Sequence, residues 1–206
     1  MKPNREYRTM EMRSVSRNDE EESYIVEGYA STFDPYVLMT IDGKEYSERI
    51  EPTAFDDADM TDVVFRVDHT GPVYARSSAG TVDVWTDEHG LGNRIDLGKT
   101  QRSKDMFADI EAGNYPQMSF AFSVAEERYE KATRTRIIEK IAKVYDVSAV
   151  SFPANPYTEL SVATRDYFNG VIEAEKAERL EREAAELKRR KAEVRARALS
   201  IGGKTK

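Results

Sequence analysis

Residues 117–124 read Gln-Met-Ser-Phe-Ala-Phe-Ser-Val, and they show the clearest two-residue alternation in the chain. Successive side chains of a β-strand point to opposite faces, so Met118, Phe120 and Phe122 share one face and Ser119 lies on the other. An apolar face this regular is expected to pack against a core, with Ser119 pointing away from it. The stretch therefore predicts a fold built on β-strands.

Further segments with strand character lie on both sides of this stretch. The expected strands cover residues 24–33, 63–69, 80–85, 90–97, 135–141 and 143–152. Residues 101–112 predict a helix, with Ser103 as its N-cap and Gly113 as the residue that ends it. Val and Ile together number 26 against seven Leu, which also favours strands. Six or more strands with one inserted helix predict a β-rich (α+β) domain, either a β-barrel or another compact arrangement.

The composition changes towards the C-terminus. Residues 171–199 contain no Gly or Pro and are dominated by Ala, Glu, Lys and Arg, which predicts a long helix. Leu180, Leu187, Val194 and Ile201 recur every seven residues. This stripe fits a solvated helix with a narrow apolar face, or a coiled coil with a second copy or a partner. We expect a flexible segment over residues 1–22, a folded domain over 23–165 and a charged helical tail over 166–206.

Charge and composition exclude several classes of protein. The net charge is −7, with 31 Lys and Arg against 38 Asp and Glu. An acidic body with a basic tail argues against a dedicated nucleic-acid-binding domain. The chain has no Cys and two His, which excludes disulfides and cysteine nucleophiles and disfavours a zinc site. No stretch has the roughly 18 apolar residues of a membrane span, and the N-terminus lacks a signal core. We expect a cytosolic protein with no metal, cofactor, membrane or required nucleic acid.

The remaining candidate chemistry is a hydroxyl, an imidazole and a carboxylate. The phosphate-loop, zinc-protease and Gly-x-Ser-x-Gly motifs are missing from the sequence. A serine nucleophile needs a base, commonly a neutral His, and the chain offers only His69 and His89. His89 lies in an acidic turn and is most simply solvated. His69 ends an apolar strand, where a side chain can protrude into a cleft, although a packed or capping histidine is the simpler explanation.

For Ser119 and Asp146, too, the sequence leaves open whether the residue is catalytic or has an ordinary structural role. A serine in an alternating strand usually faces solvent, whereas an aspartate in an apolar strand such as residues 144–150 lies at a sheet edge or has a partner. The sequence by itself does not bring these residues together with His69.

Six short stretches, taken in order, resemble the prohead proteases of tailed bacteriophages, distant relatives of the herpesvirus assemblins. Glu-Gly-Tyr-Ala-Ser-Thr-Phe is similar to the family's opening strand, and Glu-Pro-Thr-Ala-Phe to its Pro-Gly-Ala-Phe segment. Val-Asp-His matches the strand with the catalytic His, and a Gly-Leu pair matches a turn. Met-Ser-Phe-Ala-Phe, after Gly113, resembles the nucleophile strand, and Asp-Val-Ser-Ala-Val-Ser-Phe-Pro-Ala-Asn-Pro the closing block. These stretches are residues 27–33, 51–55, 67–69, 90–91, 118–122 and 146–156.

The resemblance implies a serine endopeptidase with an assemblin-like β-barrel and an inserted helix, followed by the charged helical tail. It assigns Ser119 as the nucleophile, His69 as the general base and Asp146 as the third member, where many relatives have Glu. The sequence departs from the family at two positions. Thr70 replaces a common Asp after the catalytic His, and Ala121 replaces a common Gly near the nucleophile.

The resemblance also implies a place of action and a substrate. The protease would act in the host cytoplasm, inside the assembling procapsid, on the scaffolding or major capsid precursor protein and on itself. The tail would then bind one of these proteins or a second copy of the chain. Two alternatives remain: a catalytically inactive β-rich assembly factor, and a scaffold-type protein that works through its helical tail.

Overall fold

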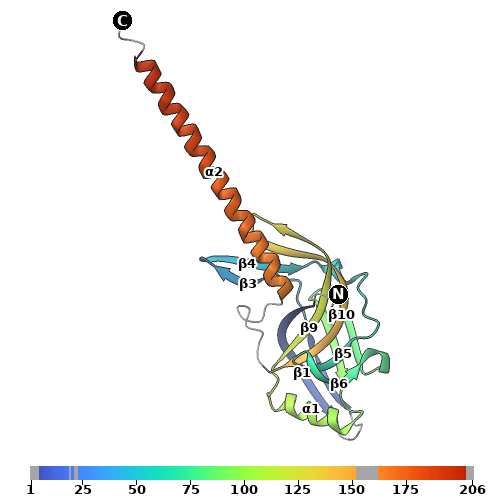
Figure 1. The fold of residues 1–206 in the computed structure, drawn as a ribbon. Helices are drawn as coiled ribbons and strands as arrows, with labels where there is room; N and C mark the ends of the chain where they lie inside the picture. The colour runs from blue at the N-terminus through green and yellow to red at the C-terminus, as the bar shows by residue number, and fades with distance from the viewer. Residues whose placement is uncertain (1–4, 19, 21–22, 152–161, 203–206) are drawn as a thin grey trace. The chain divides into compact units, whose positions relative to one another are not determined.

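The computed structural model describes residues 5–18, 20, 23–151 and 162–202. The chain divides into two compact units, residues 1–163 and 164–206, and each is described by itself. The first unit is rich in strands (Figure 1). Its elements are β1 Glu6–Asn18, β2 Ser23–Tyr29, β3 Tyr36–Ile41, β4 Lys44–Ile50, a 3-10 helix Pro52–Phe55, β5 Val64–Val67, β6 Thr70–Arg76, a 3-10 helix Ser77–Ala79, β7 Val82–Thr86, β8 Leu91–Asp96, α1 Gln101–Glu111, β9 Gln117–Glu130 and β10 Thr135–Val150.

The strands pair along an open path. The order is β3-β4-β10-β9-β1-β2-β8-β7, and the β5–β6 hairpin joins the side of β10. β10 pairs antiparallel with β9 along almost its whole length, and it pairs in parallel with β4 near its start and with β5 near its end. Among the described strands, the path ends at β3 and β7 without closing. The expected β-rich class and inserted helix are confirmed, whereas the closed barrel is not.

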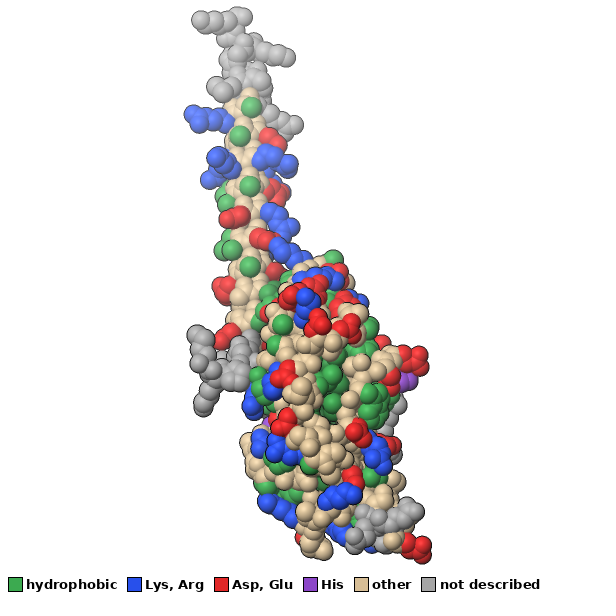
Figure 2. Space-filling model, turned by 90° about the vertical axis from the view of Figure 1, so that its right-hand side faces the viewer, with side chains coloured by type: hydrophobic (Ala, Val, Ile, Leu, Met, Phe, Trp, Pro, Cys, Tyr) green, Lys and Arg blue, Asp and Glu red, His purple; other side chains and the backbone are tan. Residues whose placement is uncertain are grey.

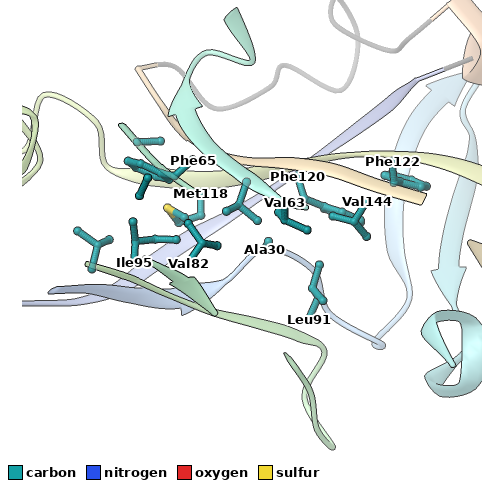
Figure 3. Packing of buried hydrophobic residues seen from close by; sticks show 14 of the residues in the cluster. Ala30, Val63, Phe65, Val82, Leu91, Ile95, Met118, Phe120, Phe122 and Val144 are labelled. Atoms are coloured by element: carbon teal, nitrogen blue, oxygen red, sulfur yellow. The ribbon is translucent and has the colours of Figure 1, made fainter. Parts of the chain in front are cut away.

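The apolar face of β9 forms the centre of the core. Met118, Phe120 and Phe122 have no exposed surface, as the alternation of residues 117–124 predicts. Figure 3 shows them packed among side chains from β5, β7 and β8. Rings of Phe120 and Phe122 stack with their centroids 4.5 Å apart. The opposite face is buried as well at this point, because Ala121 and Ser119 are at most 1% exposed. Of the two alternatives left open for Ser119, exposure to solvent is therefore excluded.

α1 differs from its prediction in one detail. Met106, Phe107 and Ile110 form its buried face, and Gly113 ends it with φ of 81°, a conformation that glycine adopts without strain. The N-cap is Thr100, whose hydroxyl accepts a hydrogen bond from the Ser103 backbone N–H. Ser103, the predicted cap, instead donates its hydroxyl to the Tyr74 carbonyl.

Two strand predictions also change. Residues 135–141 and 143–152 were expected as separate strands, but β10 is continuous, with irregular register around Lys140 to Lys143. The expected end of that strand at residue 152 and the Pro-Ala-Asn-Pro block lie outside the described residues. Residues 1–22 were expected to be flexible. Residues 6–18 of this segment form strand β1, which pairs with β2 on one side and β9 on the other.

Helix α2 Val162–Gly202 forms the described part of the second unit, which confirms the expected C-terminal helix. Leu180, Leu187 and Val194 of the predicted stripe are 60%, 54% and 68% exposed, and Figure 2 shows such apolar side chains set among charged ones. The side chain of Ile201 lies outside the described residues. Within the part of the chain that the structure describes, no helix is long and apolar enough to cross a membrane.

Phe65 offers a test of the core. We expect Phe65→Ala to lower the free energy of unfolding by about 3–5 kcal/mol, because the side chain is fully buried and its removal leaves a cavity. Val73→Ala, on the paired strand β6, is the control and should change it by less than about 0.5 kcal/mol, since Val73 is exposed. Urea denaturation measures both, and equal losses would contradict the core described here.

Candidate active site

Three side chains that lie far apart in the sequence meet in one hydrogen-bonded line. His69 Nε2 lies 2.7 Å from Ser119 Oγ, and His69 Nδ1 lies 2.6 Å from Asp146 Oδ1. These are the residues that the sequence analysis named as candidates. Both outer members are buried, with Ser119 and Asp146 each 1% exposed. The imidazole between them is mostly buried.

The sheet brings these residues together because β10 lies between β5 and β9. Ser148 of β10 pairs with Ser119 of β9 on one side and Arg66 of β5 on the other. Asp146, two residues before Ser148, has its side chain on the same face of the sheet. The β5–β6 turn then brings His69 to this face. The three residues thus come from β10, β9 and the β5–β6 turn, and strand pairing fixes the distances between these elements.

His69 sits in an unusual backbone conformation. Asp68 and His69 form the two-residue turn between β5 and β6, in which Val67 pairs with Thr70. Their φ angles are 46° and 55°. A two-residue hairpin turn with positive φ at both positions favours Asn, Asp or Gly. A non-glycine residue there costs on the order of 1 kcal/mol, and such strain is found at functional sites.

The hydrogen bonds around Asp146 define how the imidazole can act. The carboxylate accepts a hydrogen bond from the Ser148 hydroxyl at 2.8 Å, and it faces His69 Nδ1 with the same oxygen. A carboxylate is an acceptor, so it favours the tautomer with the proton on Nδ1. Nε2 then presents a lone pair to Ser119, as a general base does in a serine triad.

Strand β1 completes the surroundings of Ser119. Ser119 Oγ also lies 2.7 Å from the carbonyl oxygen of Arg8, to which it can donate its proton. A hydroxyl has a single proton, so the carbonyl competes with His69 Nε2 for it. The ring of Tyr7 packs on the imidazole of His69, with the centroids 4.4 Å apart. The sequence analysis missed both residues, because it looked for apolar strands and β1 begins with charged ones.

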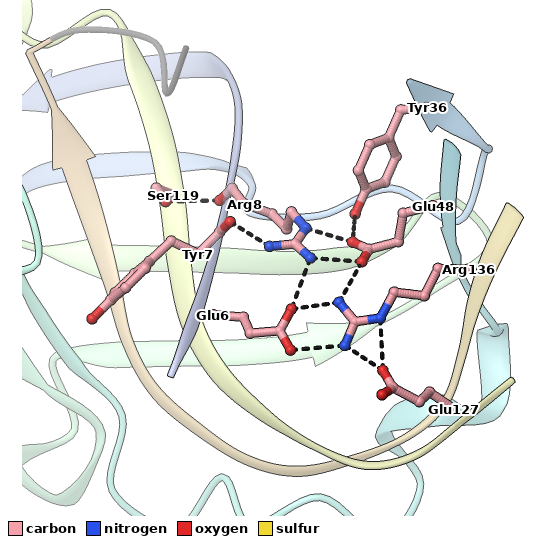
Figure 4. Close-up of polar contacts among 8 residues, drawn as sticks. All are labelled: Glu6, Tyr7, Arg8, Tyr36, Glu48, Ser119, Glu127 and Arg136. Carbon is pink, nitrogen blue, oxygen red and sulfur yellow. Dashed lines mark hydrogen bonds and ion pairs between the residues drawn. The ribbon is translucent and has the colours of Figure 1, made fainter. Parts of the chain in front are cut away.

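A buried cluster of charged residues holds the start of β1 in place (Figure 4). Arg8 donates to Glu6 at 2.9 Å and to Glu48 at 2.6 Å. Arg136 donates to Glu6 at 2.6 and 2.8 Å, to Glu48 at 2.9 Å, and to Glu127. Glu6, Arg8, Glu48 and Arg136 are at most 5% exposed. The cluster therefore ties β1 to β4, β9 and β10 through paired charges.

The cluster keeps its arginines charged. Burial has the largest single effect and lowers the pKa of Arg8, but Glu48, Tyr36 and Glu6 together outweigh it and raise the pKa above its usual value. Burial raises the pKa of the Tyr36 hydroxyl, and Glu48, which accepts its hydrogen bond at 2.6 Å, raises it further. The side chain of Arg8 is thus fixed on the cluster side, while its carbonyl faces Ser119.

His89 lies in a different setting. It is exposed in the turn between β7 and β8, 3.7 Å from the Glu88 carboxylate, and its ring packs edge-on against Tyr29. The structure therefore brings His69, and not His89, to Ser119 and Asp146. In the described part of the chain, no group of three or more His, Asp or Glu side chains is placed to hold a metal ion.

Removing one charged side chain from the cluster should destabilise the fold. We expect Glu48→Ala to lower the free energy of unfolding by about 3–5 kcal/mol, because two buried arginines lose a partner. Glu27→Ala breaks an exposed pair with Arg94 and should cost less than about 1 kcal/mol. Urea denaturation of both variants measures the difference. A loss for Glu48→Ala as small as that of the control would show that the cluster does not stabilise the fold.

Comparison with known proteins adds to this geometry. The family model described as caudovirus prohead serine protease matches residues 8–170. Among solved structures, the chain is similar to the capsid assembly protease gp21 of bacteriophage T4, with 12% identity and a TM-score of 0.44; the match covers 72% of this chain and 98% of that one. The comparison with curated proteins gave no match. Since the family match spans most of the sequence and includes the residues of the hydrogen-bonded line, this chain belongs to the caudovirus prohead serine protease family.

Proposed function

We propose that this protein is a serine endopeptidase whose nucleophile is Ser119, whose general base is His69 and whose third member is Asp146. The observation that carries the proposal is the line of hydrogen bonds from Asp146 through His69 to Ser119, within a family of prohead serine proteases. Geometry and roles identify a triad, whatever the order of its members along the chain.

The mechanism follows from the hydrogen-bond partners of the two His69 ring nitrogens. Ser119 Oγ attacks the carbonyl carbon of the scissile bond while His69 Nε2 takes its proton. When the C–N bond breaks, the imidazolium returns that proton to the leaving amine, and an acyl-enzyme remains. A water molecule then attacks the ester while His69 Nε2 removes its proton. The bond between the acyl carbon and Ser119 Oγ breaks, the imidazolium returns the proton to Oγ, and the acid product leaves. Asp146 stays ionised throughout and stabilises the imidazolium.

The site must open before a peptide can react. Ser119 is 1% exposed, and its Oγ is within hydrogen-bond distance of the Arg8 carbonyl. A scissile carbonyl carbon has to come within about 3–3.5 Å of Oγ, which a buried atom does not allow. This observation also favours the second candidate function, a catalytically inactive assembly factor. Chemical labelling of Ser119 separates the two, because an activated serine reacts with a fluorophosphonate and an inert one does not.

The substrate is proposed from the family. The chain would cleave the scaffolding or major capsid precursor protein inside the procapsid, in the host cytoplasm, and would also cleave itself. The family match ends at residue 170, so most of α2 lies beyond the matched residues. The exposed apolar stripe on this helix offers a binding face for a helical segment of the precursor or for a second copy of the chain.

The triad can be tested by substitution. We expect Ser119→Ala to abolish cleavage of the precursor and fluorophosphonate labelling, and His69→Ala to reduce both to near background, because each removes a reacting group. Asp146→Asn should lower the rate of cleavage by a factor of about 10²–10⁴, because the carboxylate that stabilises the imidazolium is lost.

Two matched controls accompany these variants. Ser123→Ala alters another serine of β9, and His89→Ala removes the exposed histidine; both should cleave at the wild-type rate. Mass spectrometry of the products also locates any cleavage within the chain itself. Normal cleavage by Ser119→Ala would overturn the assignment, and an unlabelled, inactive wild-type chain would favour the assembly factor.

The role of α2 can be tested separately. We expect replacement of its apolar stripe to leave peptide cleavage unchanged but to reduce incorporation of the protease into procapsids, because a bound helix raises the local concentration of its target. Quantitative mass spectrometry of isolated procapsids measures incorporation. The stripe variant replaces three residues by Gln, namely Leu180, Leu187 and Val194.

The control replaces the neighbouring charged residues by Gln: Glu181, Lys188 and Arg195. Equal incorporation of the stripe variant, the control and the wild type would exclude the stripe as a binding face. Analytical ultracentrifugation of the wild type and both variants distinguishes self-association from binding to the precursor.

A further inference from the structure

The turn that carries His69 is held from two sides. On one side, Arg66 of β5 donates from Nη1 to the carbonyl of His69 at 3.2 Å and from Nη2 to the carbonyl of Gly71 at 3.0 Å. On the other side, the Asp68 carboxylate accepts hydrogen bonds from the backbone N–H of Ser151 at 3.0 Å and from its hydroxyl at 3.1 and 3.2 Å. Ser151 directly follows β10, the strand of Asp146.

These contacts oppose a backbone strain. Asp68 and His69 are consecutive non-glycine residues with positive φ, a conformation that costs free energy and persists only where the surroundings impose it. Rotation of this backbone towards ordinary φ values would swing the imidazole. Because Nδ1 and Nε2 each face a partner at 2.6–2.7 Å, a shift of about 1 Å would break both contacts.

The partners of Arg66, which is partly buried, differ from those of the buried Arg136. Arg136 pairs with three carboxylates. Arg66 instead donates to two main-chain carbonyls, that of His69 in the turn and that of Gly71 in β6, and its buried Nε has no hydrogen-bond partner among the described residues. The planar fork of arginine suits two acceptors at a fixed spacing. The guanidinium of Arg66 thus restrains the backbone around His69, and these two acceptors are neutral carbonyls and not carboxylates.

We propose that Arg66 and Asp68 are positioning residues, which hold the His69 backbone in its left-handed turn so that the imidazole spans Asp146 and Ser119. The proposal rests on the proposed serine endopeptidase function. Neither residue contacts Ser119, so each acts through His69. Their loss should lower kcat and leave KM nearly unchanged, since the proposed role of both residues is to position His69 and not to bind substrate.

Substitution of Asp68 separates positioning from stability. In Asp68→Gly, glycine accepts the positive φ without strain, so the melting temperature should stay the same or rise. The carboxylate that binds Ser151 is lost, so kcat and the labelling rate of Ser119 should fall by about tenfold or more. Asp68→Asn keeps an oxygen acceptor and tolerates the left-handed conformation, and its rates should stay within about threefold of wild type.

Substitution of Arg66 has a matched control on the same hairpin. Arg66→Ala should lower kcat by about tenfold or more, and added guanidinium ion at low, non-denaturing concentration should restore part of it. Arg76→Ala removes an arginine of β6 that pairs with Asp62 in an exposed setting, so it should keep the wild-type rate. If Arg66→Ala loses activity, guanidinium does not restore it and the melting temperature also falls, then Arg66 has a structural role and its assignment as a positioning residue is overturned.

A spectroscopic readout makes the result independent of cleavage. The Nδ1 proton of His69, hydrogen-bonded to Asp146, should give a downfield proton resonance in the wild type and in Asp68→Asn, and this resonance should broaden or vanish in Asp68→Gly and Arg66→Ala. If the wild type neither cleaves nor is labelled but the resonance behaves in this way, the positioning role stands and the proposed function fails. If resonance, kcat and labelling rate are unchanged in Asp68→Gly and Arg66→Ala, the positioning role is overturned.

Discussion

The antiparallel pairing of β9 with β10 is the constraint on which the rest of the structure depends. It places Ser148 beside Ser119 and, through the two-residue repeat of a strand, directs Asp146 to the same face. The other edge of β10 receives β5, so the turn that carries His69 comes to this face as well. A register shift of one residue would send Asp146 to the opposite face of the sheet. The apolar side chains on the other face of β9 fix the register, because they must stay in the core.

β1 adds a second constraint on the site, through charge. Its side chains alternate between a charged cluster on one face and the hydrogen-bonded line on the other: Glu6 and Arg8 enter the cluster, while Tyr7 packs on His69. Each buried ion loses hydration, and the pairing with Glu48 and Arg136 offsets this cost only while every member is present. The start of β1, and with it the Arg8 carbonyl beside Ser119, is therefore held by a cluster that loses stability sharply when one member is removed.

The sequence was sufficient for some of these features and insufficient for others, for physical reasons. The alternation of residues 117–124 predicts β9 and its buried face, because hydrophobic burial has a clear period. β1 could not be found in this way, since its inward residues are charged and become buried only by pairing with Glu48 and Arg136, which lie far along the chain. The contact of His69 with Asp146 depends on strand order, and the burial of Ser119 depends on β1. The residue pattern named Ser119, His69 and Asp146 as candidates, and the family resemblance joined them into one set.

The depth of the charged cluster has a consequence for how the molecule responds to ionic strength. Counterions screen exposed charges over about 8 Å at physiological salt, but they do not enter a cluster whose carboxylates and guanidinium groups are desolvated. The pairs along α2, such as Arg190 with Glu186 and Arg179 with Glu183, are exposed to solvent. A change of salt concentration would thus alter the electrostatics of the helix while leaving β1 docked beside Ser119. The position of β1 beside Ser119 therefore depends little on ionic strength, whereas the electrostatics of the helical tail depends on it strongly.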